Sequence, residues 1–312
     1  MGHEDGSVTL RDSKEGAIKA QFKRGGPIWC MEWSPSAEEV LPVLAVGAWD
    51  FPGEGGGTLS FYQERGQQQG KSIQLGFDPT SLAFFSAGEY LVVGGSDKKA
   101  WLFTRDGIRL HPVCEKKDWV WTAKPRPGTQ KGHYVAVGTA DGNLAMHQLM
   151  FSTVHGLYQD RYAYRDGMTD VIVQHMLTER RVRLKLHAYV KKISVYTNRL
   201  AVQLPDSVHV YELQEGGDQF SMHYRAMRRI KRPIDCNLLV VTSQHVTLCM
   251  EKRLQLLSLD GDTEREWVFD AVIRYIKVVG GPPGGEALLV GLRNGAVMQV
   301  FVGNPFPLEL VR

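Results

Sequence analysis

The residues of this chain that could support chemistry are a glycine-rich loop, scattered histidines and two basic runs. The loop Gly53-Glu54-Gly55-Gly56-Gly57-Thr58 has the composition of a phosphate-binding loop. It lacks the Lys-Ser/Thr pair and the following helix that turn backbone N–H groups toward a phosphate. A flexible turn between two strands fits the loop better, and the proline-containing stretch 280–285 also predicts a turn. The sequence therefore predicts no cofactor.

The histidines do not form a metal-binding pattern. Metal sites use closely spaced ligands. The histidines here are isolated from one another in sequence, including His111, His133, His147, His155, His175, His209 and His245. No G-x-S-x-G nucleophile elbow occurs. We predict neither a metal site nor a catalytic residue. A hydrolase or isomerase stays open as an alternative, because the members of a Ser–His–Asp triad need not be neighbours in sequence.

The basic runs could carry an electrostatic contact. The first run places five basic side chains within eight residues, namely Arg225, Arg228, Arg229, Lys231 and Arg232. They could contact an acidic partner surface or phospholipid headgroups. The alternative is an outer strand that uses its charges to prevent edge-to-edge pairing. The second run, 180–185, has the same two interpretations. No aromatic platform accompanies these charges, so we expect no nucleic-acid binding.

Composition limits the class of protein. The 312 residues include 37 basic and 34 acidic side chains, which gives a net charge of only +3 and no global field. An apolar content of 43% is enough for a buried core. Four scattered cysteines without C-x-x-C pairing favour a reducing compartment. No signal peptide and no apolar run of about 18 residues is present, so we expect no transmembrane segment.

The elements that must position these residues are short strands in a repeated pattern. Six stretches share two short apolar runs joined by a tight turn, about every 45 residues, which is the period of β-propeller blades. The turns at Asp97 and Asp141, for example, lie 44 residues apart (141 − 97). Alternating runs such as 193–196, 199–204 and 207–211 predict three consecutive strands. Helical periodicity is hard to find, and the sequence predicts an all-β protein.

Two tandem propellers, each incomplete in this chain, are the architecture that we expect. One interval between turns is 65 residues (206 − 141), and we place a domain boundary near residue 160 within it. The same interval contains an extra predicted strand pair around residues 171–173 and 182–184. Residues 1–160 would be the C-terminal blades of a first WD40-like propeller, and residues 161–312 the N-terminal blades of a second. Neither half has enough blades to close a ring. A single seven-bladed propeller with an insertion is the alternative.

The tryptophans and the last residues of the third strands indicate how the blades pack. Six tryptophans fall in predicted strands, and we expect them to pack between blades: Trp29, Trp33, Trp101, Trp119, Trp121 and Trp267. Third strands end in pairs such as Phe61-Tyr62 and Leu102-Phe103 instead of the Trp-Asp pair of regular WD repeats. The propellers are therefore degenerate.

Several long motifs carry a resemblance to a known family. They are the segment 151–166, the runs 168–175, 190–193 and 198–201, Cys236-Asn237-Leu238-Leu239-Val240-Val241, Glu264-Arg265-Glu266-Trp267 and the segment 273–284, with 27–30, 94–98 and 119–122 in the N-terminal part. The chain resembles the intraflagellar transport protein 122 family over nearly its whole length. That family has two tandem propellers followed by a helical-repeat tail, and the chain lacks the first blades, part of the second propeller and the tail. It therefore resembles an internal fragment.

The resemblance implies a function in cilia. The family consists of WD-repeat subunits of intraflagellar transport complex A (IFT-A complex), a scaffold that supports retrograde transport, cilium biogenesis and ciliary entry of membrane proteins. It implies protein binding to other subunits of this complex, with ciliary membrane-protein cargo or adaptors as further partners. It implies a location in the cilium, at the axoneme and basal body, and in the cytoplasm. A WD-repeat adaptor of the vesicle-coat or ubiquitin-ligase type, unrelated to cilia, is the alternative that the period alone allows.

Overall fold

The computed structural model describes the chain except for residues 36–40, 50–55, 129–132, 215–221 and 312. It consists almost entirely of strands, with one short 3-10 helix, η1 (Ser86–Gly88), among the described residues. The strands form two compact units, residues 1–151 (unit 1) and 152–312 (unit 2). The prediction of an all-β fold is confirmed.

Unit 1 contains four antiparallel sheets, which follow one another in chain order. The first two sheets are formed by β1 (Ser7–Arg11) and β2 (Ile18–Lys23), and by β3 (Ile28–Trp33), β4 (Leu44–Ala48), β5 (Thr58–Tyr62) and β6 (Gln68–Gln74). The last two are formed by β7 (Pro79–Phe85), β8 (Tyr90–Gly95), β9 (Lys99–Thr104) and β10 (Arg109–Glu115), and by β11 (Val120–Pro125), β12 (His133–Thr139) and β13 (Leu144–Leu149). Only the two central sheets have four strands.

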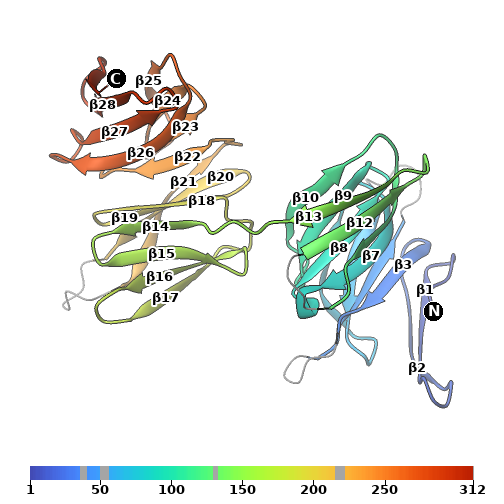
Figure 1. Cartoon of the computed structure of the whole chain (residues 1–312). Helices are drawn as coiled ribbons and strands as arrows, with labels where there is room; N and C mark the ends of the chain where they lie inside the picture. The colour runs from blue at the N-terminus through green and yellow to red at the C-terminus, as the bar shows by residue number, and fades with distance from the viewer. Residues whose placement is uncertain (36–40, 50–55, 129–132, 215–221, 312) are drawn as a thin grey trace. The chain divides into compact units, whose positions relative to one another are not determined.

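Unit 2 contains four sheets of four strands each. Figure 1 shows them stacked in chain order, from green to red. The first two are formed by β14 (His155–Tyr158), β15 (Arg161–Asp166), β16 (Asp170–His175) and β17 (Arg181–Lys185), and by β18 (Lys192–Tyr196), β19 (Arg199–Gln203), β20 (Ser207–Leu213) and β21 (Tyr224–Lys231). The last two are formed by β22 (Leu238–Val241), β23 (His245–Met250), β24 (Arg253–Ser258) and β25 (Thr263–Val268), and by β26 (Ile273–Gly280), β27 (Ala287–Leu292), β28 (Val297–Phe301) and β29 (Leu308–Val311).

The core lies between consecutive sheets, as the radial packing of propeller blades requires. Successive side chains of a strand point to opposite faces of the sheet. A sheet that packs against a neighbouring sheet on each face is therefore apolar on both faces. Val208 and Val210 of β20 pack with Leu248 of the next sheet, whereas Tyr211 packs with Leu200 and Val173 toward the preceding sheet. The first strands of neighbouring sheets also contact one another, β14 with β18 and β18 with β22. This is the arrangement of blades around a central axis.

The long interval between turns contains a complete sheet. The sequence predicted only an extra strand pair around residues 171–173 and 182–184, but β14 to β17 form four strands with a turn after Asp166. The break between the units lies after Phe151. The expected boundary at residue 160 falls instead within the hairpin of β14 and β15, because these two strands pair with each other.

The tryptophan prediction is wrong for three of the six side chains. Trp267 is buried, but Trp29, Trp33 and Trp121 are exposed by 47%, 42% and 39%. Trp29 and Trp33 lie on β3, and Trp121 lies on β11. Both are first strands of their sheets. Side chains on the inner side of a first strand meet no facing sheet, so their burial does not follow from the strand pattern.

Candidate functional site

The basic run 225–232 occupies the outer strand of its sheet. β21 pairs with β20 alone among the described strands. Arg229 lies opposite His209, and Lys231 lies opposite Ser207. Because side chains alternate between the two faces of a sheet, these two cations share one face. Burial lowers the pKa of His209, and the nearby charge of Arg229 lowers it further.

A bulge places two other arginines on the opposite face. The register shifts between Val210 and Tyr211, so that Val210 lies opposite Arg228 and Glu212 lies opposite Arg225. Together with Ala226 and Met227, the residues Glu212, Arg225 and Arg228 line a groove of about 230 Å³. The four predicted contact residues within β21 therefore form two groups, one on each face of the strand, and Arg232 directly follows the strand.

Two of the five basic side chains, Arg228 and Arg232, make hydrogen bonds within unit 2. The Arg228 Nε donates to Asp260 Oδ1 at 2.7 Å, and Arg232 donates to Gln255 at 3.5 Å. Arg225, Arg229 and Lys231 are exposed, and no ion pair joins them to the residues that the structure describes. These three side chains are the ones available to an anionic partner.

The second basic run also forms an outer strand. β17 ends its sheet, with Arg181, Arg183 and Lys185 all exposed. Arg183 pairs with Asp166 at 2.7 Å and with Asp170 at 3.0 Å. This run therefore has fewer uncommitted charges than β21 has.

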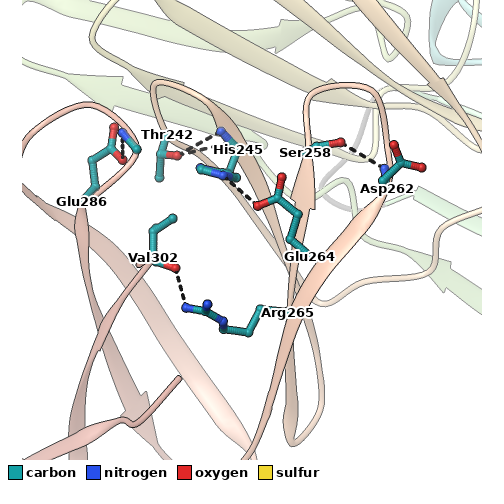
Figure 2. Close-up of polar contacts among 9 residues, drawn as sticks. Thr242, His245, Ser258, Asp262, Glu264, Arg265, Glu286 and Val302 are labelled. Atoms are coloured by element: carbon teal, nitrogen blue, oxygen red, sulfur yellow. Dashed lines mark hydrogen bonds and ion pairs between the residues drawn. The ribbon is translucent and has the colours of Figure 1, made fainter. Parts of the chain in front are cut away.

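A polar network joins neighbouring sheets of unit 2 at their first turns (Figure 2). The fully buried Glu286 accepts the backbone N–H of Ser243 and that of Gly284, each at 3.0 Å. His245 lies 3.0 Å from the Glu264 carboxylate. The Ser243 carbonyl accepts a hydrogen bond from Arg199 at 3.1 Å. The Glu286 and Arg199 contacts join neighbouring sheets, whereas His245 and Glu264 lie in the same sheet. Sequence reasoning that searched for exposed chemistry missed these contacts.

The inner strands of unit 2 line an open groove of about 400 Å³. An enzyme built on these blades would need acidic or histidine side chains to converge there. Among the described residues that line the groove, His155 and Lys277 are the ionisable ones besides tyrosines, and none is a carboxylate.

The other features that the sequence singled out add no metal or phosphate site among the described residues. Residues 53–55 of the glycine-rich loop lie outside the described residues, and Thr58 begins a strand instead of a helix. In the part of the chain that the structure describes, no group of three His, Cys, Asp or Glu side chains is placed to hold a metal. None of the described helices could span a membrane.

Comparisons with known proteins agree with this geometry. A family model described as the IFT122 second beta-propeller matches residues 155–312. The intraflagellar transport protein 122 homolog of Xenopus tropicalis is 51% identical over 316 residues, covering 100% of this chain and 26% of that protein. The Homo sapiens homolog is 52% identical over 275 residues, covering 88% of this chain and 21% of that protein.

Solved structures are more distant. The Cps50 (Swd1) β-propeller domain of Myceliophteria thermophila is 12% identical, with a TM-score of 0.37, and the match covers 90% of this chain and 98% of that one. A score this low says nothing detailed about the fold. The chain spans about a quarter of the length of the curated relatives that it matches. With sheets of the propeller type and a family match that begins at the first strand of unit 2, the chain belongs to the intraflagellar transport protein 122 family.

Proposed function

We propose that this chain is part of a non-enzymatic scaffold subunit of intraflagellar transport complex A, and that it acts by docking other proteins. The observation that carries the proposal is the 51% identity to an intraflagellar transport protein 122 homolog over the whole chain. Outer strands and turns that expose charged and apolar side chains suit protein docking. The partners are other subunits of the complex, with ciliary membrane-protein cargo or adaptors as further partners.

The finer role follows from the family. We infer that the subunit supports retrograde intraciliary transport, cilium assembly and ciliary entry of membrane proteins, at the axoneme, the basal body and in the cytoplasm. We also infer that unit 1 supplies the last blades of a first propeller and unit 2 the first blades of a second. The three-stranded sheet β11–β13 supports this division, because a closed ring needs a further strand beside β13.

Affinity purification from ciliated cells tests the scaffold function. The tagged 312-residue chain and a version extended to the length of its relatives are purified side by side, and retained proteins are identified by mass spectrometry. Recovery of other complex A subunits by the extended form supports the proposal. If neither form retains them while both are folded, the adaptor unrelated to cilia becomes the better account.

We further propose that the edge of β21 contacts an acidic surface of a partner subunit, through Arg229 and Lys231 on one face of the strand and Arg225 on the other, with Arg228 and Arg232 supporting the strand. Exposure and the lack of ion pairs with described residues favour this contact over a structural role. Reversal of the three charges to glutamate in the extended form should reduce retention of one subunit and increase its salt sensitivity. Reversal of Arg181 and Lys185 on β17 is the matched control. Equal retention by both variants would contradict the proposed contact.

A further inference from the structure

Four tryptophans of unit 1 form a closed ring of aromatic contacts. Trp29 stacks on Trp49, with ring centroids 4.2 Å apart and planes 19° apart. Trp49 meets Trp119 edge to face at 6.3 Å, Trp119 contacts Trp121 at 5.9 Å, and Trp121 returns to Trp29 at 6.1 Å. We call these residues the tryptophan quartet. No buried core explains it, because Trp29 and Trp121 are 47% and 39% exposed.

Three sheets hold the quartet in place. Trp29 is the second residue of β3 and Trp49 follows β4, whereas Trp119 and Trp121 flank the first residue of β11. The Trp49 indole N–H donates to the carbonyl of Pro79, at the start of β7, at 2.7 Å. The Trp119 carbonyl accepts the N–H of Ala140 at 2.9 Å. The quartet is therefore a preorganised surface, which lowers the entropic cost of binding a ligand.

The side chains of the quartet offer hydrogen-bond donors and no acceptors. The indole N–H groups of Trp29, Trp119 and Trp121 donate to none of the residues that the structure describes. A tryptophan side chain is a donor with no acceptor. A complementary ligand therefore presents flat apolar faces together with carbonyl acceptors.

The spacing of the rings argues against a cationic ligand. A cation that contacts an aromatic face lies within about 6 Å of the ring centroid, and rings whose centroids are 4.2 to 6.3 Å apart leave no room for a cation between them. Charges of both signs lie beside the quartet in sequence. Lys116 and Lys117 precede Trp119 by three and two residues, and Asp118 directly precedes Trp119 and accepts its backbone N–H at 2.8 Å. These charges therefore select neither an anionic nor a cationic ligand.

We propose that the tryptophan quartet binds a proline-rich segment in the polyproline II conformation. Proline rings pack on aromatic faces, and such a segment has carbonyl acceptors without internal hydrogen bonds. Proline has no N–H donor to leave unpaired against the indole donors.

The test uses the 312-residue chain and three synthetic peptides. The probe is an octaproline followed by two glutamates, and binding is followed by tryptophan fluorescence and by calorimetry. An octaproline followed by two lysines and a short peptide that contains trimethyl-lysine are the comparison ligands. The variants are the double substitution W29A/W121A, the substitution W121F, which keeps an aromatic ring but removes the N–H donor, and W33A. Trp33 lies on the same strand as Trp29 with similar exposure, outside the quartet.

We expect saturable binding of the octaproline-glutamate probe. W29A/W121A should weaken it at least about tenfold, as loss of central aromatic contacts does, W121F should weaken it a few-fold, and W33A should leave it unchanged. The lysine-tailed peptide should bind with an affinity similar to that of the probe, because the proline rings and carbonyls make the contact. No saturable binding, equal affinity for W29A/W121A and W33A at matched thermal stability, or tighter binding of the trimethyl-lysine peptide would each overturn the proposal.

Discussion

Replacement of Glu286 by glutamine is expected to loosen the packing of the last two sheets of unit 2. The Glu286 carboxylate is fully buried and joins the turn after β22, through the N–H of Ser243, to the turn after β26, through the N–H of Gly284. On its other side, Ser243 accepts a hydrogen bond from Arg199 of β19 through its carbonyl. The carboxylate therefore joins the turns of two successive sheets, and the carbonyl of Ser243 extends the link to a third.

The magnitude follows from the hydrogen bonds that glutamine can make. A carboxylate accepts at both oxygens, whereas the amide of glutamine offers one acceptor and one donor group. One of the two N–H groups would therefore face another donor in a buried site. A hydrogen bond to a charged group contributes about 1.5–3 kcal/mol. The neutral amide also has a smaller desolvation penalty than a carboxylate has, which offsets part of the loss. We expect the free energy of unfolding of unit 2 to fall by about 2 kcal/mol.

Hydrogen exchange in increasing urea, read by mass spectrometry on peptides of unit 2, measures this change. The matched control is Glu115→Gln, because the Glu115 side chain is 71% exposed and pairs only with Lys99 at 3.3 Å. Such an exposed pair contributes at most about 1 kcal/mol. Faster exchange at Ser243 and Gly284 in the Glu286→Gln variant would locate the effect. Equal stability of the two variants, with both amides still protected, would refute the reasoning.

Three further predictions concern ionisation, backbone conformation and the free edge of unit 1. Burial raises the pKa of Cys30 from 9.0 to about 12, so above pH 9 the unfolded state binds fewer protons than the folded state. The free energy of unfolding should therefore fall as the pH rises from about 9 to about 12. Cys30→Ser should flatten this pH dependence, as measured by urea unfolding at each pH. Gly107 has a φ of +83°, and an added Cβ would collide with Ile73; Gly107→Ala should therefore lower the melting temperature more than Gly142→Ala, where φ is +82° and no atom lies within 4 Å. Met146 is 72% exposed on the edge strand β13; Met146→Lys should reduce self-association in light scattering, and unchanged association would show that this edge is not the adhesive surface.

Local chemistry in the sequence determined the strands and most turns of this protein. The alternation of apolar and polar residues over 207–211 predicts a strand, and β20 occupies that position as the third strand of its sheet. The Asp141-Gly142 turn joins β12 to β13, with Gly142 at a φ of +82°. The same kind of turn at Asp166-Gly167 marks the sheet β14–β17, of which the sequence analysis predicted only one strand pair. Its strands have only four to six residues, and a short run gives a weak periodic signal.

The basic strand shows what a sequence pattern leaves open. Strict alternation would place Arg225, Arg229 and Lys231 on one face of β21. The bulge opposite Val210 and Tyr211 moves Arg225 to the other face, beside Arg228. A single unpaired residue changes the face of every side chain on one side of it, and nothing in the run 225–232 specifies where that residue falls.

The tryptophan quartet and the Glu286 network exist only in the tertiary structure. Trp29 and Trp121 are 92 positions apart in sequence (121 − 29), and β7 lies between their strands. Local patterns predict that a residue lies in a strand, because backbone pairing and side-chain alternation involve neighbours along the chain. Which face of that strand is covered, and by which side chain, depends on the next sheet. The sequence therefore determined the strands of each blade. The packing of one blade on the next decided which side chains became buried core, which joined neighbouring sheets as Glu286 does, and which stayed exposed as the tryptophan quartet does.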